Sequence, residues 1–216
     1  MKSNFNLKCK KYLWPLLVAH RLVWRPTSYL HQTGWVESHK RGYPCDKSGE
    51  EVPWMNYSVI SFLKERLNKN LSLFEYGCGY STLFYSRLVR DVVSVEYDQI
   101  WLDHIKSTMP DNVELVYRDK DSDGDYCRTI SSVGNSFDVV IVDGRDRVNC
   151  VREAFTQLKK GGVVVLDDSG RDRYQEAFNI AKHNGFRALN IEGIKPTGNQ
   201  IHRTTIFYTD NSCLAF

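Results

Sequence analysis

The residues best suited to chemistry begin at the end of a short apolar run, in Glu75-Tyr76-Gly77-Cys78-Gly79-Tyr80-Ser81. Two glycines at the end of a strand let the backbone pass close to a ligand at the start of the following helix. The third glycine of the dinucleotide fingerprint is missing, so this turn disfavours a cofactor that contains a pyrophosphate. It predicts a binding site for another kind of ligand.

An acidic residue ends the next apolar run, in Ser94-Val95-Glu96-Tyr97-Asp98. Glu96 lies close to the offset of roughly 20 residues at which an acid holds a pair of ribose hydroxyls. Carboxylates at both strand ends suit a cationic cofactor, because sulfonium and amino groups favour carboxylates whereas phosphates favour amides and cations. The two segments together predict a pocket for a positively charged cofactor with a ribose.

Two acidic clusters follow later apolar runs, Asp143-Gly144-Arg145-Asp146-Arg147 and Asp167-Asp168-Ser169-Gly170-Arg171. Carboxylates on adjacent strand ends can bind one Mg²⁺-like ion, which prefers oxygen ligands. The candidate ligands are Asp143, Asp167 and Asp168. In the alternative interpretation the acids pair with Arg145, Arg147, Arg171 and Arg173 and bind no metal.

Apolar runs alternate with helical patterns throughout the second part of the chain. The expected strands cover residues 71–75, 92–96, 113–117, 137–143, 163–166, 187–191 and 204–208, and the expected helices cover 56–67, 82–88, 101–108, 148–158 and 174–183. Several of the strands are apolar on both faces, which is typical of a parallel sheet with helices on each side. We expect an α/β fold with a doubly wound, mainly parallel, seven-stranded sheet. Its ligands should lie beyond the carboxyl ends of the strands.

The first 52 residues are expected to form an N-terminal extension or lid, and residues 53–216 the main domain. Residues 13–24 are apolar, too short to span a bilayer and interrupted by His20 and Arg21. They predict an amphipathic helix that packs on the domain or on a partner, which includes a second copy of the chain. The alternative is a helix lying on a membrane surface. Residues 32–53 are predicted to be a long loop or lid.

The overall composition indicates a globular protein. The chain has 29 basic and 26 acidic residues, a balance that gives no reason to expect a nucleic-acid partner. Its six cysteines form no C-x-x-C pair, so neither a zinc site nor a disulfide framework is indicated, and a reducing cytoplasm is the expected location.

The turn 75–79, the acid Glu96 and the run Phe137-Asp138-Val139-Val140-Ile141-Val142-Asp143 resemble the successive motifs of class I S-adenosylmethionine (SAM)-dependent methyltransferases. This resemblance implies a Rossmann-like methyltransferase fold and SAM as the cofactor. By the same resemblance, Glu96 would hold the ribose hydroxyls, Tyr97 would flank the adenine and Asp119 would lie near it. The expected cofactor-binding residues are Glu75, Tyr76, Gly77, Gly79, Ser81, Glu96, Tyr97, Asp119 and Asp143.

The acidic clusters further resemble metal-dependent O-methyltransferases, including some that modify sugars, which would make Mg²⁺ a second cofactor. We therefore expect O-methylation of a carbohydrate or another small polar acceptor. Arg145 and Arg171 are expected to bind that acceptor, since guanidinium groups recognise anionic oxygens. Without a metal, Asp143 or His202 would act as the base.

Three alternatives remain open from the sequence. Methyl transfer to nitrogen is less favoured, because the Asn/Asp-Pro-Pro-Tyr type of motif is absent after Asp143. An aminopropyltransferase like spermidine synthase shares the fold and the acidic strand ends, and would use decarboxylated SAM. A methyltransferase-like binding scaffold without activity is the third alternative.

Overall fold

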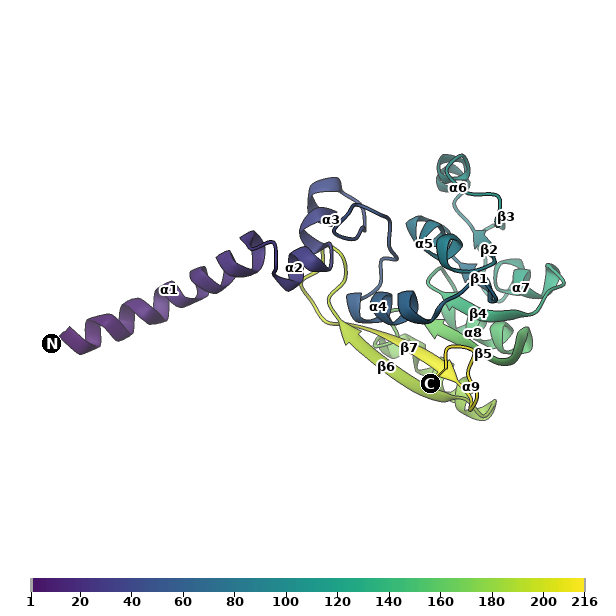
Figure 1. The fold of residues 1–216 in the computed structure, drawn as a ribbon. Coiled ribbons are helices and arrows are strands. Elements are labelled where there is room, and N and C mark those ends of the chain that lie inside the picture. Colours follow the sequence, from purple (N-terminus) through teal and green to yellow (C-terminus); the bar gives the residue numbers. More distant parts are fainter. Residues whose placement is uncertain (1, 216) are drawn as a thin grey trace.

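The computed structural model describes residues 2–215, with side chains from Leu13 onward, and is built around a seven-stranded sheet (Figure 1). The strand order is β3-β2-β1-β4-β5-β7-β6. The strands are β1 (Ser72–Tyr76), β2 (Asp91–Glu96), β3 (Val113–Tyr117), β4 (Phe137–Val142), β5 (Leu158–Leu166), β6 (Arg187–Gly193) and β7 (His202–Tyr208). The first five are parallel to one another, and β7 pairs antiparallel with both β5 and β6. The predicted fold class is confirmed.

Helices cover both faces of the sheet and bury two hydrophobic clusters against it. One face carries α4 (Tyr57–Arg66) and α5 (Tyr80–Leu88), and the other carries α7 (Asp125–Ser132), α8 (Arg147–Thr156) and α9 (Gln175–His183). The 3-10 turn η1 (Asp172–Tyr174) precedes α9, and α6 (Gln99–Lys106) packs beside β3. The central strands β1 and β4 are almost entirely buried, which explains their continuous apolar sequences.

Two local predictions differ from the structure. Helix α7 has no counterpart among the helices expected from the sequence. The predicted helix 148–158 ends earlier, at Thr156, and strand β5 begins at Leu158 rather than at the predicted residue 163. Gly161 adopts a left-handed conformation, with a φ of 77°, inside this strand.

The N-terminal part is more helical than predicted. It consists of α1 (Lys2–Trp24), α2 (Tyr29–Gln32) and α3 (Trp35–Arg41), so part of the expected loop or lid 32–53 is helix. Helix α1 projects away from the sheet and contacts α2 (Figure 1). Residues 13–24 do not pack on the domain, because their large apolar side chains are exposed, Trp14 by 62% and Trp24 by 70%. Packing of this segment on a partner stays a prediction. Among the described residues, none of the helices is long and apolar enough to cross a membrane.

Candidate functional site

A cavity of about 680 Å³ opens at the carboxyl ends of β1, β2 and β4, where ligands of such sheets bind. Its volume lies in the usual range for small-molecule sites, roughly 300–1,000 Å³. Six of the nine expected cofactor-binding residues line it, namely Gly77, Gly79, Ser81, Glu96, Tyr97 and Asp143. The fold therefore brings most of the residues predicted from the motifs together in one cavity.

The glycine turn forms the floor of this cavity between β1 and α5. Gly77 has a φ of 96°, and a Cβ atom added there would lie only 3.1 Å from Cα of Gly144. That close approach between the loops after β1 and β4, together with the positive φ, disfavours any side chain at this position. Gly79 precedes α5, whose first turn faces the cavity, so its backbone is open to a ligand.

Glu96 is held rigidly at the end of β2. Its carboxylate accepts hydrogen bonds from the backbone N–H groups of Tyr97 and Asp98, at 2.8 and 2.9 Å, and of Cys78, at 3.1 Å. Burial raises the pKa of Glu96, although these three amide bonds oppose the shift. A fixed carboxylate beside a cavity of this size suits a ribose diol, so the residues present fit the nucleoside part of SAM.

Two of the expected cofactor residues lie behind the cavity wall. Glu75 is fully buried and accepts hydrogen bonds from the hydroxyls of Ser81, Thr82 and Ser94. The side chain of Tyr76 is also fully buried, and its hydroxyl donates to the carbonyl of Cys127 at 2.7 Å. The expectation that these side chains contact a cofactor does not match the structure, because neither lines the cavity. Glu75 instead stabilises the turn by hydrogen bonds to Ser81 and Thr82.

The structure places Asp119 outside the cavity lining, where it is exposed and accepts a hydrogen bond of 2.7 Å from the hydroxyl of Tyr117. Tyr97, in contrast, lies at the cavity wall. The guanidinium of Arg145 stacks over its ring, 5.3 Å from the centroid, and donates to its hydroxyl. Arg145, expected to bind the acceptor, therefore lines the same cavity as Glu96.

A second cavity, of about 360 Å³, adjoins the first. Both cavities are lined by Trp54, Asp143 and Arg171, so they meet at these three residues. The second cavity is also lined by Asp168, Lys195 and His202 and by the loop from Pro196 to Gly198. Two cavities that share three lining residues can hold a cofactor and an acceptor side by side.

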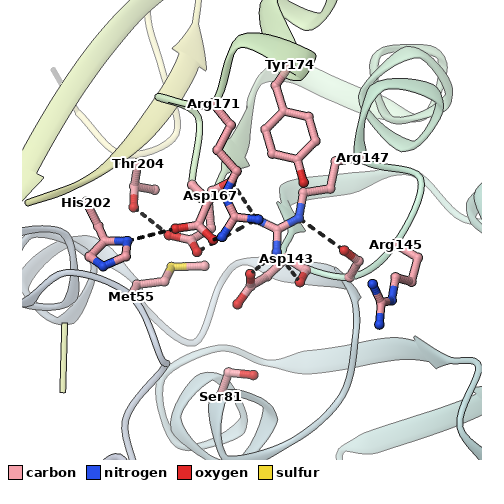
Figure 2. A network of polar contacts seen from close by, with 12 residues as sticks. Met55, Ser81, Asp143, Arg145, Arg147, Asp167, Arg171, Tyr174, His202 and Thr204 are labelled. Atoms are coloured by element: carbon pink, nitrogen blue, oxygen red, sulfur yellow. Dashed lines mark hydrogen bonds and ion pairs between the residues drawn. The ribbon is translucent and has the colours of Figure 1, made fainter. Parts of the chain in front are cut away.

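The three aspartates predicted to bind metal do lie together, but cations of the chain accompany them. Arg147 contacts the Asp143 carboxylate at 2.8 Å, and its other N–H groups donate to the carbonyls of Asp143, Gly144 and Asp167 (Figure 2). It thereby ties the end of β4 to the end of β5. Burial and the neighbouring Asp167 carboxylate raise the pKa of Asp143 well above its ordinary value.

Lys195 completes this network. Its ammonium lies 2.6 Å from Oδ2 of Asp167 and 2.9 Å from Oδ1 of Asp168, and Arg171 pairs with the other oxygen of Asp168. Asp167 is fully buried and also accepts a hydrogen bond of 2.8 Å from Thr204. No group of three or more metal-ligating side chains stands free among the described residues. This donor set does not fit Mg²⁺. Of the four arginines expected to pair with the acids, Arg147 and Arg171 do so. Arg145 instead contacts Tyr97, and Arg173 contacts Tyr174.

His202 also belongs to this site. Its Nδ1 atom lies 3.1 Å from Oδ1 of Asp168, and its ring lines the second cavity. His202 lies just before the predicted strand 204–208, whereas the structure places it at the start of β7 beside β6. Although burial works against it, hydrogen bonding to Lys195 and the charge of that ammonium lower the pKa of Asp168 to about 2. An ionised carboxylate that fixes a histidine is a common arrangement for a general base.

The N-terminal extension contributes Pro44 to the first cavity. Trp54, which follows the extension, is exposed and lines both cavities. Trp35 of α3 donates its indole N–H to the carbonyl of Gly198 at 2.7 Å and so anchors the loop that carries Lys195. Tyr57 is buried and lines neither cavity. Its backbone N–H donates a hydrogen bond of 3.0 Å to the carbonyl of Ile194.

Sequence reasoning did not predict Lys195 or Trp35 as part of the site. A single lysine between two strands gives no signal of burial, because lysine is ordinarily exposed. The contacts of Lys195 with the aspartates and of Trp35 with Gly198 depend on how β6, β7 and α3 pack around the loop 194–201.

Comparisons with known proteins agree with this geometry. A family model described as a methyltransferase domain matches residues 74–169. The protein-L-isoaspartate O-methyltransferase of Dictyoglomus turgidum is 25% identical over 205 residues, which cover 89% of this chain and 84% of that protein.

Similar folds occur among solved structures. Aeropyrum pernix fibrillarin with natively bound SAM has a TM-score of 0.52 at 11% identity, over 66% of this chain and 68% of that one. Spermidine synthase with a transition-state analogue has a TM-score of 0.53 at 15% identity, over 70% and 56%. Residues 74–169 therefore match a methyltransferase domain, and the fold of the chain is similar to folds that include a SAM-bound protein.

Proposed function

We propose that the chain methylates an oxygen atom of a small polar acceptor, of which a carbohydrate is our first candidate. The cofactor would occupy the cavity beside Glu96, and the acceptor the cavity beside His202. The observation that carries this proposal is the His202–Asp168 pair, which lines a cavity that adjoins the cofactor cavity.

A histidine fixed by an ionised carboxylate favours oxygen over nitrogen as the methylated atom. A neutral amine carries a free lone pair, whereas a hydroxyl must lose its proton as it attacks, so a base is needed. His202 Nε2 would take that proton while Asp168 holds the ring. Asp143, whose pKa is raised, lies at the junction of the two cavities and is the second candidate for the base.

When bound, SAM supplies a methyl group on a positively charged sulfur, and this group is transferred to the acceptor oxygen. The chain must chiefly align the two reactants and keep them close together. Trp54, shared by both cavities, would cover the point of transfer, and Arg171 would interact with the acceptor. Arg145 lies on the cofactor side, so its expected contact is with the part of the acceptor nearest Tyr97.

The acceptor class can be tested with SAM that carries a labelled methyl group. Purified protein is incubated with panels of sugars, sugar nucleotides and hydroxy acids, and labelled products are identified by mass spectrometry. We expect an ether product, which is stable in mild base. A base-labile product would show carboxyl methylation, the kind of O-methylation named for the isoaspartate relative. Transfer from decarboxylated SAM alone would replace the proposal with an aminopropyltransferase.

We further propose that α1 contacts an anionic membrane surface. Leu13, Trp14, Leu16, Leu17 and Trp24 are each more than half exposed. No acidic residue occurs before Glu37, while basic residues occur at Lys2, Lys8, Lys10, Lys11, Arg21 and Arg25. Exposed tryptophans and leucines beside basic residues suit the interface of anionic lipids. Since the five described cysteines are unpaired, we place that surface on the cytoplasmic side.

A further inference from the structure

We propose that Lys195 is a built-in cation that takes the place of a divalent metal ion in the acceptor site. This inference deepens the proposed function, on which it rests for the identity of the acceptor cavity. The clustered aspartates resemble a metal site in sequence, and the structure supplies a lysine ammonium where the metal would be needed.

The geometry around Lys195 resembles coordination by oxygen. The ammonium lies between carboxylate oxygens of two consecutive residues, 2.6 Å from Asp167 and 2.9 Å from Asp168. The Lys195 side chain is only 9% exposed, and the Asp167 side chain is fully buried. An ammonium has three N–H donors, so these two contacts leave one donor for the adjoining cavity.

The three aspartates are already paired without a metal ion. Arg147 lies beside Asp143, Lys195 lies beside Asp167 and Asp168, and Arg171 lies beside Asp168. Burying such charges is costly unless each one is paired. A divalent ion added here would face cations at short range, and its binding would require Lys195 to leave.

The loop that carries Lys195 is held in position by contacts on both sides. The carbonyl of Ile194 accepts a hydrogen bond from Tyr57, and the carbonyl of Gly198 accepts one from Trp35. The backbone N–H of Gly198 also donates to the carbonyl of Lys195, which closes the turn. Since α3, α4 and this turn fix the lysine, the ammonium is a permanent part of the site.

The test is a calorimetric titration with Mn²⁺ alone, in metal-free buffer, of the wild type, Lys195→Ala and Lys195→Arg. We expect no saturable binding at millimolar Mn²⁺ to the wild type or to Lys195→Arg, because each keeps a cation. Lys195→Ala should acquire a site that binds at least about tenfold more tightly than any site of the wild type, since it leaves carboxylates unpaired. Lys159→Ala is the matched control, because Lys159 pairs with Asp138 and Ser72 away from the cavity. That control should acquire no site.

Two results would overturn the inference. One is Mn²⁺ binding to the wild type that is lost in Asp167→Asn, which would show a true metal site. The other is a folded Lys195→Ala protein that gains no site. If Lys195→Ala does not fold, the wild-type and Lys195→Arg titrations still test the inference, because saturable Mn²⁺ binding to either protein would contradict it. SAM titrations of the same proteins test the cofactor site separately. Absence of SAM binding to the wild type would count against the proposed function and not against the role of Lys195.

Discussion

His202 and Asp168 share a hydrogen bond of 3.1 Å between Nδ1 and Oδ1, and the same carboxylate oxygen lies 2.9 Å from the Lys195 ammonium. The pKa of Asp168, lowered to about 2, keeps it ionised throughout the physiological range. The imidazole is therefore oriented by a permanent negative charge, and its Nε2 atom is the one left to exchange a proton with the acceptor.

Replacing His202 with Asn should reduce the rate of methyl transfer by roughly 100-fold or more, the usual contribution of a general base. SAM affinity should remain unchanged, because His202 lines the acceptor cavity and does not line the cofactor cavity. The measurement is single-turnover transfer to the acceptor found in the labelling experiment. His183→Asn, at the exposed end of α9, is the control. If His202→Asn retains the wild-type rate while Asp143→Asn loses it, Asp143 is the base.

The buried carboxyl of Glu75 should make the free energy of unfolding depend on pH. Burial raises its pKa from 4.5 to about 7, against the opposing effect of three hydroxyl donors. The folded state therefore holds this proton more tightly than the unfolded state, so the stabilisation is full below about pH 4.5 and is lost as pH rises toward 7.

Glu75→Gln removes that titration. Relative to the wild type, its free energy of unfolding should rise by about 3 kcal/mol between pH 4.5 and pH 8, a conversion of the pKa shift. Urea unfolding at both pH values measures the difference, and Glu114→Gln, on exposed β3 surface, serves as control. A difference that stays constant with pH would contradict the placement of Glu75.

Trp35 should control the mobility of the loop 194–201. Trp35→Phe keeps an aromatic ring but removes the hydrogen bond of 2.7 Å to Gly198, worth about 1 kcal/mol. Amide hydrogen exchange in this loop should then become roughly fivefold faster, while exchange in β1 and β4 stays the same. Trp24→Phe, on the exposed end of α1, is the control. Unchanged loop exchange would show that α3 does not anchor Lys195.

The proposed role of α1 can be tested with lipid vesicles. The wild type should sediment with phosphatidylserine-containing vesicles but not with phosphatidylcholine vesicles, and binding should weaken as salt increases. Trp14→Glu combined with Leu17→Glu should reduce binding by at least about tenfold, because it removes apolar contact and adds negative charge. Absence of vesicle binding together with dimerisation in sedimentation velocity would instead identify a second copy of the chain as the partner.

Much of the fold could be predicted from the sequence because buried parallel strands have continuous apolar sequences, as in β4 and the second half of β5. Helix α7 was missed because its inward-facing residues, Tyr126, Cys127, Thr129 and Ile130, are not strong helix formers. The early part of β5 was missed because it contains two lysines and two glycines, which do not form an apolar run. In the fold Gly161 lies against the C-terminal segment, where an added Cβ would lie 2.6 Å from the carbonyl oxygen of Asn211.

For the site, the turn at Gly77 and the acid Glu96 were found because both lie at fixed positions after strands. The sequence could not show that Tyr76 faces the core, since alternation in a fully buried strand does not mark one face. It also could not separate a metal site from an ion-pair cluster. That distinction depends on Lys195, which lies 27 residues after Asp168 in sequence and reaches it only through the turn between β6 and β7.

The most direct test of the account is calorimetric titration of the wild type and Glu96→Ala with SAM and S-adenosylhomocysteine. We predict micromolar binding of both ligands to the wild type and affinity lower by roughly 100-fold in Glu96→Ala, the loss of charged hydrogen bonds to the ribose. Asp119→Ala, outside the cavity, should bind nearly as the wild type does. Equal affinity of the wild type and a folded Glu96→Ala protein, or no binding of either ligand, would contradict the placement of the cofactor.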